Sequence, residues 1–399
     1  MADIGVKKIG CVIAYRKGHT NYGTSLVGYS LVRKLRELGF DIEIINYVKR
    51  LTLFEKLRYL ANAFMCGGLR KLLIRRRVGD AINENSDYGE GLRKRTEVVE
   101  AYKSRKLEPL FRQYVGFKSL SEGSVKYRAI VVGSDQVWTP MSLPNKYFNL
   151  LFAADQVRKV AYASSFGVSE IPWFQRKATG KYLDRFYRIG VREVRGKEIV
   201  EELSKKEAKV VADPTLLLSA SEWEEEARES RFGSGDPYIF VYLLGPNQDG
   251  RKAARELKQR TGLRIITLKH MDEYVAEDET FGDEWPYDVD PNDFVRLISK
   301  ASYVITDSFH CSAFSIQFHR RFMTFYRFRQ GSSQGRNSRI DSLFSVLGIS
   351  RNRIYSGDVG HIDDEVDWKE VDKRLKTLRQ DSIGFLKEAL DWNEEGKKR

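Results

Sequence analysis

The feature that most constrains the fold is a strand–helix–strand unit near the start of the chain. Lys8-Ile-Gly-Cys-Val-Ile-Ala-Tyr15 is a continuous apolar run, typical of a parallel strand that is buried on both faces. Residues 24–38 carry apolar side chains at helical spacing up to Gly39, and residues 40–47 form the next apolar run. Strands connected in this way predict a parallel sheet covered by helices.

The same alternation continues in two series along the 399 residues. Apolar runs at 127–132, 157–163 and 208–212 complete the first series, and runs at 238–244, 263–268, 303–305 and 322–326 form the second. A segment at 219–236 that is first acidic and then rich in turn residues separates them. We therefore predict an α/β protein with two Rossmann-like domains facing a cleft, residues 1–225 and 236–375, followed by a C-terminal helix at 376–399.

A basic segment interrupts the first series. Residues 50–115 are predicted to be an all-helical insertion, and residues 49–78 hold nine Lys or Arg against one acid, Glu55, in a chain of net charge +13. Residues 53–77 alternate Leu and aromatic residues with cations at helical spacing. Such a helix can lie in a membrane interface beside anionic lipids, or it can pack on its own domain with a solvated basic face. No nucleic-acid-binding motif accompanies it, so we expect no nucleic acid partner.

Other features limit the location and the cofactors. No run of eighteen apolar residues appears, and the first residues lack the long apolar region of a signal peptide, so we expect a cytoplasmic protein. Cys11, Cys66 and Cys311 lie far apart, and the five histidines form no zinc-type cluster. We therefore expect free thiols and no metal.

The candidate site centres on Thr306-Asp-Ser-Phe-His310. This segment lies between an apolar run and a helical pattern, where backbone N–H groups and the helix end favour anions. His310 is a candidate acid or base, whereas Asp307 can act as a base or simply cap the helix. Polar residues also follow three strands of the first series: Asn21, Ser134, Asp135 and Ser165. Because ligands bind at the carboxyl edge of such sheets, we expect these side chains to face one cleft.

Six motifs stand in one order along the chain: Asn21-Tyr-Gly, Gly133-Ser-Asp-Gln-Val-Trp138, Ser165-Phe-Gly167, Val191-Arg-Glu193, Asp213-Pro-Thr-Leu-Leu217 and Thr306-Asp-Ser-Phe-His310. Together they resemble the polysaccharide pyruvyl transferase family over roughly residues 8–350. The resemblance implies two Rossmann-like domains arranged as in GT-B glycosyltransferases. It also implies transfer of the enolpyruvyl group of phosphoenolpyruvate onto a sugar as a cyclic ketal, without metal or cofactor. We expect a hexose acceptor, such as galactose, in an oligosaccharide still attached to a lipid carrier.

The resemblance also suggests roles for individual residues. His310 falls at the family's motif histidine, and Arg192 matches an arginine that binds phosphoenolpyruvate, although a salt bridge to Glu193 or another acid is an alternative role. Asp135 and Asp307 are candidate bases or acceptors for sugar hydroxyls. Ser308 stands where some branches of the family place a second arginine, so it is a candidate contact to the substrate. The candidates for the second cation are Arg327, Arg336 and Arg339, of which Arg339 is favoured because it begins a predicted helix.

Two other functions fit the same pattern. A glycosyltransferase using a nucleotide sugar would share the fold, because fold does not determine chemistry. A non-enzymatic protein that binds glycans or anions is the second alternative. Stabilisation by a nucleoside diphosphate would favour the first, and absence of turnover with varied acceptors would favour the second.

Overall fold

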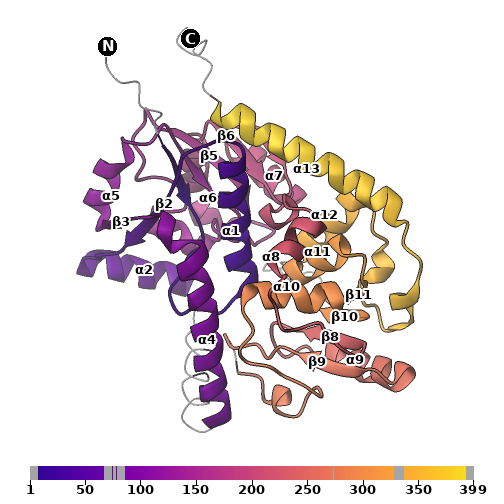
Figure 1. Ribbon diagram of the computed structural model, residues 1–399. Coiled ribbons are helices and arrows are strands. Elements are labelled where there is room, and N and C mark those ends of the chain that lie inside the picture. Colours follow the sequence, from indigo (N-terminus) through magenta and orange to yellow (C-terminus); the bar gives the residue numbers. More distant parts are fainter. Residues whose placement is uncertain are drawn as a thin grey trace.

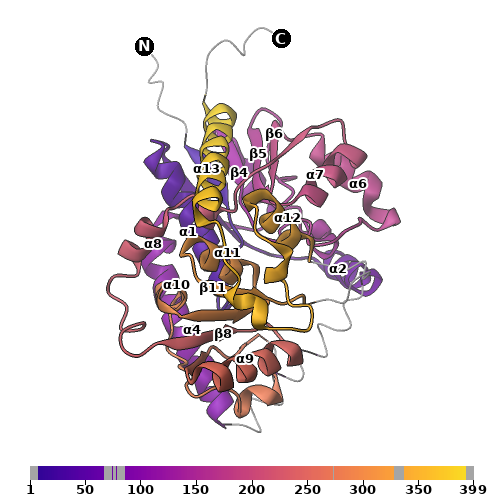
Figure 2. The same cartoon turned by 90° about the vertical axis from the view of Figure 1, so that its right-hand side faces the viewer.

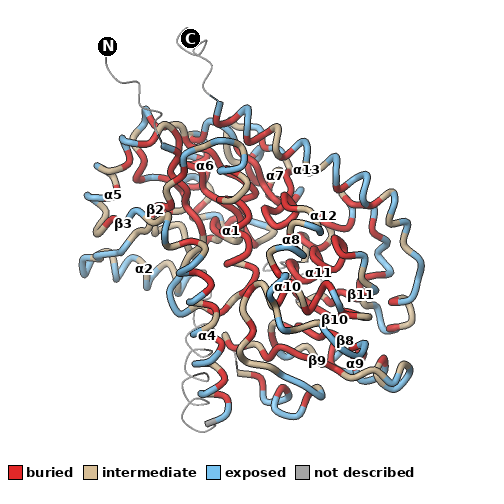
Figure 3. The backbone as a smooth tube through the Cα atoms, viewed as in Figure 1, coloured by how far each residue is buried: buried red, intermediate tan, exposed pale blue. Residues whose placement is uncertain are grey.

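A computed structural model describes residues 8–66, 74, 78, 86–272, 274–327 and 337–391. It contains two separate sheets, each made entirely of parallel strands and each covered by helices (Figure 1). The α/β prediction with two Rossmann-like domains is therefore confirmed. Figure 3 shows the strands of both sheets as largely buried, as their uninterrupted apolar sequences require.

The larger sheet has seven strands in the order β3-β2-β1-β4-β5-β6-β7. These are β1 Ile9–Val12, β2 Ile42–Val48, β3 Phe111–Val115, β4 Ala129–Val132, β5 Arg158–Ser164, β6 Arg188–Val191 and β7 Ala208–Val210. The strand order reverses direction between β1 and β4. A crevice at the carboxyl ends of these two strands is where a doubly wound sheet usually binds its ligand.

The smaller sheet has four strands in the order β11-β10-β8-β9. These are β8 Tyr238–Tyr242, β9 Arg264–Thr267, β10 Tyr303–Thr306 and β11 Arg321–Thr324. Here the order reverses between β8 and β10. The segment around His310 follows β10 directly, so it lies at the second sheet's own binding edge.

Twelve helices connect or cover these strands within the described residues. They are α1 Tyr22–Glu37, α2 Leu53–Met65, α4 Ser86–Lys106, α5 Phe117–Ser124, α6 Trp173–Leu183, α7 Val194–Leu203, α8 Ala220–Glu226, α9 Gln248–Thr261, α10 Pro291–Lys300, α11 Phe309–Gln317, α12 Ser338–Leu347 and α13 Trp368–Leu390. None of them combines the length and apolar character that crossing a bilayer requires.

The predicted all-helical insertion at 50–115 is wrong at its end. Residues 111–115 form strand β3, which pairs in parallel with Ile44–Val48 of β2 at the edge of the larger sheet. The segment is short and keeps Arg112 and Gln113 exposed, as is usual for an edge strand. It therefore lacks the apolar run that identified the central strands.

The C-terminal helix begins earlier than predicted and belongs to both domains. α13 starts at Trp368, not at 376, and runs from the smaller domain back across the larger one (Figures 1 and 2). Ser382 accepts a hydrogen bond from the backbone N–H of Ala212 at 2.8 Å, and Phe385 packs beside Gly190 of β6. Residues 381–390 thus pack against the larger domain, although they follow the smaller domain in the sequence.

The two domains share one apolar core on the α1 side of the molecule. Tyr22 of α1 stacks on Phe294 of α10 with ring centroids 4.7 Å apart. Trp223 of α8, inside the predicted linker, packs edge-on against Phe314 of α11 at 5.2 Å. The segment between the domains is therefore a packed element rather than a loose connection.

Candidate functional site

The site lies where the binding edges of the two sheets meet. α1 begins after β1, and Asn21 caps it by accepting a hydrogen bond from the Thr24 N–H at 3.1 Å. α11 begins after β10, with Ser308 as its cap. Only the missing side chain of Gly23 lets these helix ends approach, because a Cβ there would lie 2.2 Å from Nδ1 of His310. His310 of the smaller domain is thereby held against the first turn of α1.

Asp213 connects the two domains at this point. Its Oδ2 accepts hydrogen bonds from Arg192 Nη1 at 2.9 Å and Ser134 Oγ at 3.1 Å, and lies 3.7 Å from His310 Nε2. Its Oδ1 accepts from the N–H and hydroxyl of Thr215. Burial alone would raise the pKa of this carboxyl, but its neighbours His310 and Arg192 hold it far below its ordinary value. Asp213 is therefore a fixed negative charge.

Arg192 presents an unused edge within the buried site. Its side chain is only 1% exposed, and Nη1 bonds to Asp213. Nε and Nη2 have no hydrogen-bond partner, and the guanidinium lies over the Phe309 ring, 4.5 Å from the centroid. Two adjacent N–H groups of arginine match the two oxygens of a carboxylate or phosphate. Both the predicted salt bridge and the predicted anion contact thus have a place, and the acid closest to Arg192 is Asp213.

Two carboxyl groups flank this unused edge of Arg192. Glu193 Oε2 lies 3.9 Å from Arg192 Nε, and Asp135 Oδ1 lies 4.0 Å from Arg192 Nη2. Glu193 Oε1 accepts a hydrogen bond from Ser165 Oγ at 2.7 Å, whereas Oε2 has no partner. Asp135 accepts from Thr24 Oγ1 at 2.9 Å and from the Gln136 N–H at 2.8 Å. The two carboxyl groups lie at similar distances from Arg192, but they accept different hydrogen bonds.

Their environments shift the two pKa values in opposite directions. Burial raises the pKa of Glu193 and outweighs the opposing charge of Arg192. Burial also acts on Asp135, but there the charges of Arg192 and His310 outweigh it and lower the pKa. Such a divergent pair is how proteins place an acid and a base in one site. Asp135 also has a φ of +91°, a strained backbone conformation of the kind that clusters at functional sites.

Two further arginines extend the site: Arg339 neighbours Arg192, and Arg327 neighbours Arg339. Arg339 begins α12 as predicted, is buried, and lies 5.9 Å from the centroid of the same Phe309 ring. Burial and then the charge of Arg192 lower its pKa, so the arginine cluster would be stabilised by an anion. Arg327 Nη2 donates to the carbonyl of Asp307 at 3.3 Å, while its Nε lacks a partner. Arg336 lies outside the described residues.

Several predicted site residues make contacts within the protein. The Asp307 carboxylate accepts from the Leu244 N–H at 2.8 Å and from Asn247 Nδ2 at 3.4 Å, so it holds the loop after β8. The helix cap is Ser308, whose Oγ accepts from the Cys311 N–H. Ser134, Ser165 and Asn21 likewise hold Asp213, Glu193 and α1. Their predicted contacts to substrate stay predictions.

Asp213 and Glu193 were missed as site residues by the sequence reasoning. Both lie in the quoted motifs directly after apolar strands, and this position was the available signal. Their importance depends on burial and on partners far along the chain, which a single sequence does not display.

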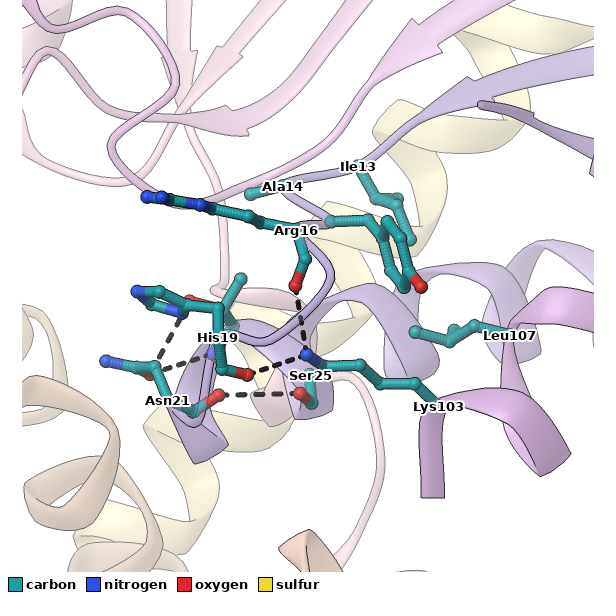
Figure 4. A pocket seen from close by; sticks show the side chains of 10 residues that line it. Ile13, Ala14, Arg16, His19, Asn21, Ser25, Lys103 and Leu107 are labelled. Atoms are coloured by element: carbon teal, nitrogen blue, oxygen red, sulfur yellow. Dashed lines mark hydrogen bonds between the residues drawn. The ribbon is translucent and has the colours of Figure 1, made fainter. Parts of the chain in front are cut away.

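A pocket opens beside Asn21, between the loop after β1 and helix α4 (Figure 4). It is lined by Ile13, Ala14, Tyr15, Arg16, His19, Asn21, Thr24, Ser25, Lys103 and Leu107. Lys103 Nζ closes its wall by donating to the carbonyls of Arg16 and His19, at 3.1 and 2.6 Å. Thr24 belongs to this pocket and also bonds to Asp135, so the pocket adjoins the carboxyl pair. Across the described part of the chain, no group of three or more His, Cys, Asp or Glu side chains could hold a metal ion.

Comparison with known proteins gives one family and a set of solved structures. The profile of a family described as polysaccharide pyruvyl transferase matches residues 21–327. No curated protein shows a significant match.

The solved structures that match are of low similarity. The UDP-GlcNAc 2-epimerase from Neisseria meningitidis bound to UDP-GlcNAc is 8% identical with a TM-score of 0.47, over 97% of this chain and 95% of that one. A putative UDP-N-acetylglucosamine 2-epimerase from Listeria monocytogenes is 10% identical at 0.49, over 98% and 92%. The E. coli ADP-heptose LPS heptosyltransferase II is 11% identical at 0.34, over 94% and 99%.

Proposed function

Because the chain belongs to the polysaccharide pyruvyl transferase family, we propose that it transfers the enolpyruvyl group of phosphoenolpyruvate onto two hydroxyls of a hexose, such as galactose. The product would be a cyclic pyruvate ketal, with release of phosphate and without metal or cofactor. The observation that carries this proposal is the buried Arg192 with two unpartnered N–H groups between two carboxyls of opposite protonation preference.

The donor binds through the arginine cluster in this proposal. The unused edge of Arg192 takes one anionic group of phosphoenolpyruvate, its carboxylate or its phosphate. Arg339, whose buried charge lies beside that of Arg192, takes the other, with Arg327 next to it. These cations neutralise a donor that carries several negative charges, in a site that excludes water.

The carboxyl pair and His310 supply the proton steps. Glu193, which burial favours in its protonated form, donates a proton to the methylene carbon of phosphoenolpyruvate, and C2 becomes an oxocarbenium-like centre. One sugar hydroxyl forms a C–O bond to C2 and gives its proton to Asp135 or His310. The bond between C2 and the phosphate oxygen then breaks, and phosphate leaves with the electron pair. The second hydroxyl adds to C2 and closes the ring, and it gives its proton to the Glu193 carboxylate, which restores the acid.

The acceptor side is proposed from the pocket of Figure 4. Its polar groups, including His19, Arg16 and Asn21, suit sugar hydroxyls, and Thr24 links it to Asp135. We propose that the hexose belongs to a polysaccharide precursor on a lipid carrier and that the enzyme works in the cytoplasm, peripherally on the inner face of the membrane.

The test is phosphate release from phosphoenolpyruvate across a panel of lipid-linked glycans, with mass detection of the product. A glycan that gains a pyruvate ketal while phosphate is released supports the proposal. Thermal stabilisation by a nucleoside diphosphate, and none by phosphoenolpyruvate, would instead favour a nucleotide-sugar glycosyltransferase. Binding of glycans without turnover on any acceptor would favour a non-enzymatic binding protein.

A further inference from the structure

Helix α2 turns its apolar side away from the protein. Leu53, Leu57, Leu60 and Phe64 repeat at intervals of four, three and four residues, so they form one stripe along the helix. They are 75, 56, 62 and 68% exposed, and none of the 13 residues of α2 is buried (Figure 3). A surface helix ordinarily shows the reverse arrangement, with its apolar stripe facing the core.

Specific contacts fix this orientation. Asn62, on the face opposite the stripe, donates from Nδ2 to the carbonyls of Pro140 and Met141 at 3.3 Å, and its Oδ1 accepts from Gln175 Nε2 at 2.7 Å. The first turn is closed by a reciprocal capping box between Thr52 and Glu55. The polar side of α2 is thus bonded to the protein, and this bonding holds the apolar side outward.

Positive charges border the stripe. Lys56 lies beside it by helical spacing, and Lys49 and Arg50 precede the helix, whereas Arg58 lies nearer the face of Asn62 and donates to the carbonyl of Pro144 at 3.4 Å. The helix's one acid, Glu55, is engaged in the cap. An apolar stripe bordered by cations is complementary to an anionic bilayer surface. A second copy of this chain would instead bring like charges together.

We propose that α2 lies in the plane of an anionic membrane surface, with Leu53, Leu57, Leu60 and Phe64 among the acyl chains and Lys56 at the headgroups. This inference deepens the proposed function, on which it rests for the membrane-borne acceptor. α2 follows the carboxyl end of β2 and contacts residues 140–145, which come shortly after Asp135. Docking would therefore bring the edge of the sheet that carries the site toward the lipid surface (Figures 1 and 2).

The experiment measures co-sedimentation of the full chain with phosphatidylcholine vesicles, with and without phosphatidylglycerol. We expect binding that requires the anionic lipid. The double variant Leu57→Gln/Leu60→Gln should weaken it at least about tenfold, because two leucine side chains lose their apolar burial. Lys56→Gln should weaken it about fivefold at low salt. The matched controls are Val125→Gln, an exposed apolar residue at the end of α5, and Lys373→Gln on α13. Neither should change binding.

Three results would overturn the inference: no binding by the unaltered chain, equal binding by the α2 variants, or a dimer that Leu57→Gln/Leu60→Gln dissociates without any vesicle binding. Phosphate release on a detergent-dispersed acceptor separates this inference from the proposed function. The α2 variants should retain that activity, since they do not touch the site. Vesicle binding without any phosphate release would contradict the ketal chemistry and leave the membrane surface supported.

Discussion

At the scale of single residues, the site is a set of charges that neutralise one another incompletely. Asp213 takes one N–H of Arg192, whereas Asp135 and Glu193 lie 4.0 and 3.9 Å from the other two nitrogens, within ion-pair range but beyond hydrogen-bonding distance. Unpartnered buried N–H groups cost free energy, so such an arrangement persists where a ligand supplies the missing acceptors. Arg192 is therefore the residue whose replacement should be most informative.

Arg192→Lys should lower kcat/KM for phosphoenolpyruvate by a hundredfold or more, about 3 kcal/mol, because an ammonium cannot bond to Asp213 and also present two parallel N–H groups to an anion. Steady-state phosphate release measures this loss. Arg195→Lys is the matched control, since Arg195 is on α7, three residues away, and bonds to Ser169 and Glu198. A similar loss in both variants would contradict a specific role for Arg192.

Glu193→Gln should lower kcat by about a hundredfold to ten-thousandfold and leave KM for phosphoenolpyruvate nearly unchanged, because the amide keeps the shape but has no acidic proton to give. The pKa of Glu193 is raised, so its proton is present below that pKa and is lost as pH rises through it. The kcat of the unaltered enzyme should therefore fall on the alkaline side.

The variant should lose this alkaline limb of the pH profile. Glu198→Gln, a half-exposed residue of α7, serves as the control and should keep both the rate and the profile. If the limb persisted in Glu193→Gln, the proton donor would have to be another group, and His310 would be the first candidate.

At the scale of elements, the strands and helices that could be predicted are those whose apolar residues form a clear local pattern in the sequence. The buried strands β1, β4 and β10, the helix after β1 and the junction before His310 all followed from local patterns. The edge strand β3 could not be predicted in this way, because it mixes polar and apolar side chains and its register is set by pairing with β2. Likewise the outward face of α2 depends on Asn62 meeting Pro140 and Gln175, which no local pattern encodes.

The same reasoning explains the candidate site. His310 and Asp135 were predicted because each follows a strand at the binding edge of its own sheet, whereas Arg192 was predicted from the resemblance to the family. Asp213 was missed because its partners lie 21, 79 and 97 positions away, so only the fold brings them together. Asp307 satisfies a loop N–H within the folded chain, a use that the sequence could not distinguish from catalysis.

The close approach of α1 and α11 can be tested with a glycine pair. Gly23→Ala would place a Cβ 2.2 Å from His310 Nδ1, so His310 must move and activity should fall strongly. Alanine in a helix otherwise stabilises by up to about 1 kcal/mol relative to glycine. Gly384→Ala in α13 shows that benefit alone, because a Cβ there meets nothing within 4 Å.

Phosphate release and thermal unfolding separate the two effects. Gly384→Ala should keep full activity with an equal or higher Tm. Gly23→Ala should lose activity without gaining stability. An active Gly23→Ala variant with a raised Tm would mean that His310 need not contact the first turn of α1.

At the scale of the whole molecule, the two domains are joined by more than the chain that connects them. Tyr22 and Phe294 stack across the boundary, Trp223 meets Phe314, and α13 returns from the smaller domain to close the larger one. The binding edges of both sheets meet beside this shared core. The site is therefore built by the same contacts that unite the domains.

The shared core predicts that the protein unfolds in one cooperative transition, although it has two sheets. Phe281→Ala removes a side chain from an apolar cluster that belongs to the smaller domain alone, and Phe294→Ala removes one from the shared core. Each should cost about 3–5 kcal/mol and shift the single calorimetric transition as a whole. Two resolved transitions, of which Phe281→Ala lowers only one, would show that the domains unfold independently and that the stacking of Tyr22 on Phe294 does not couple them.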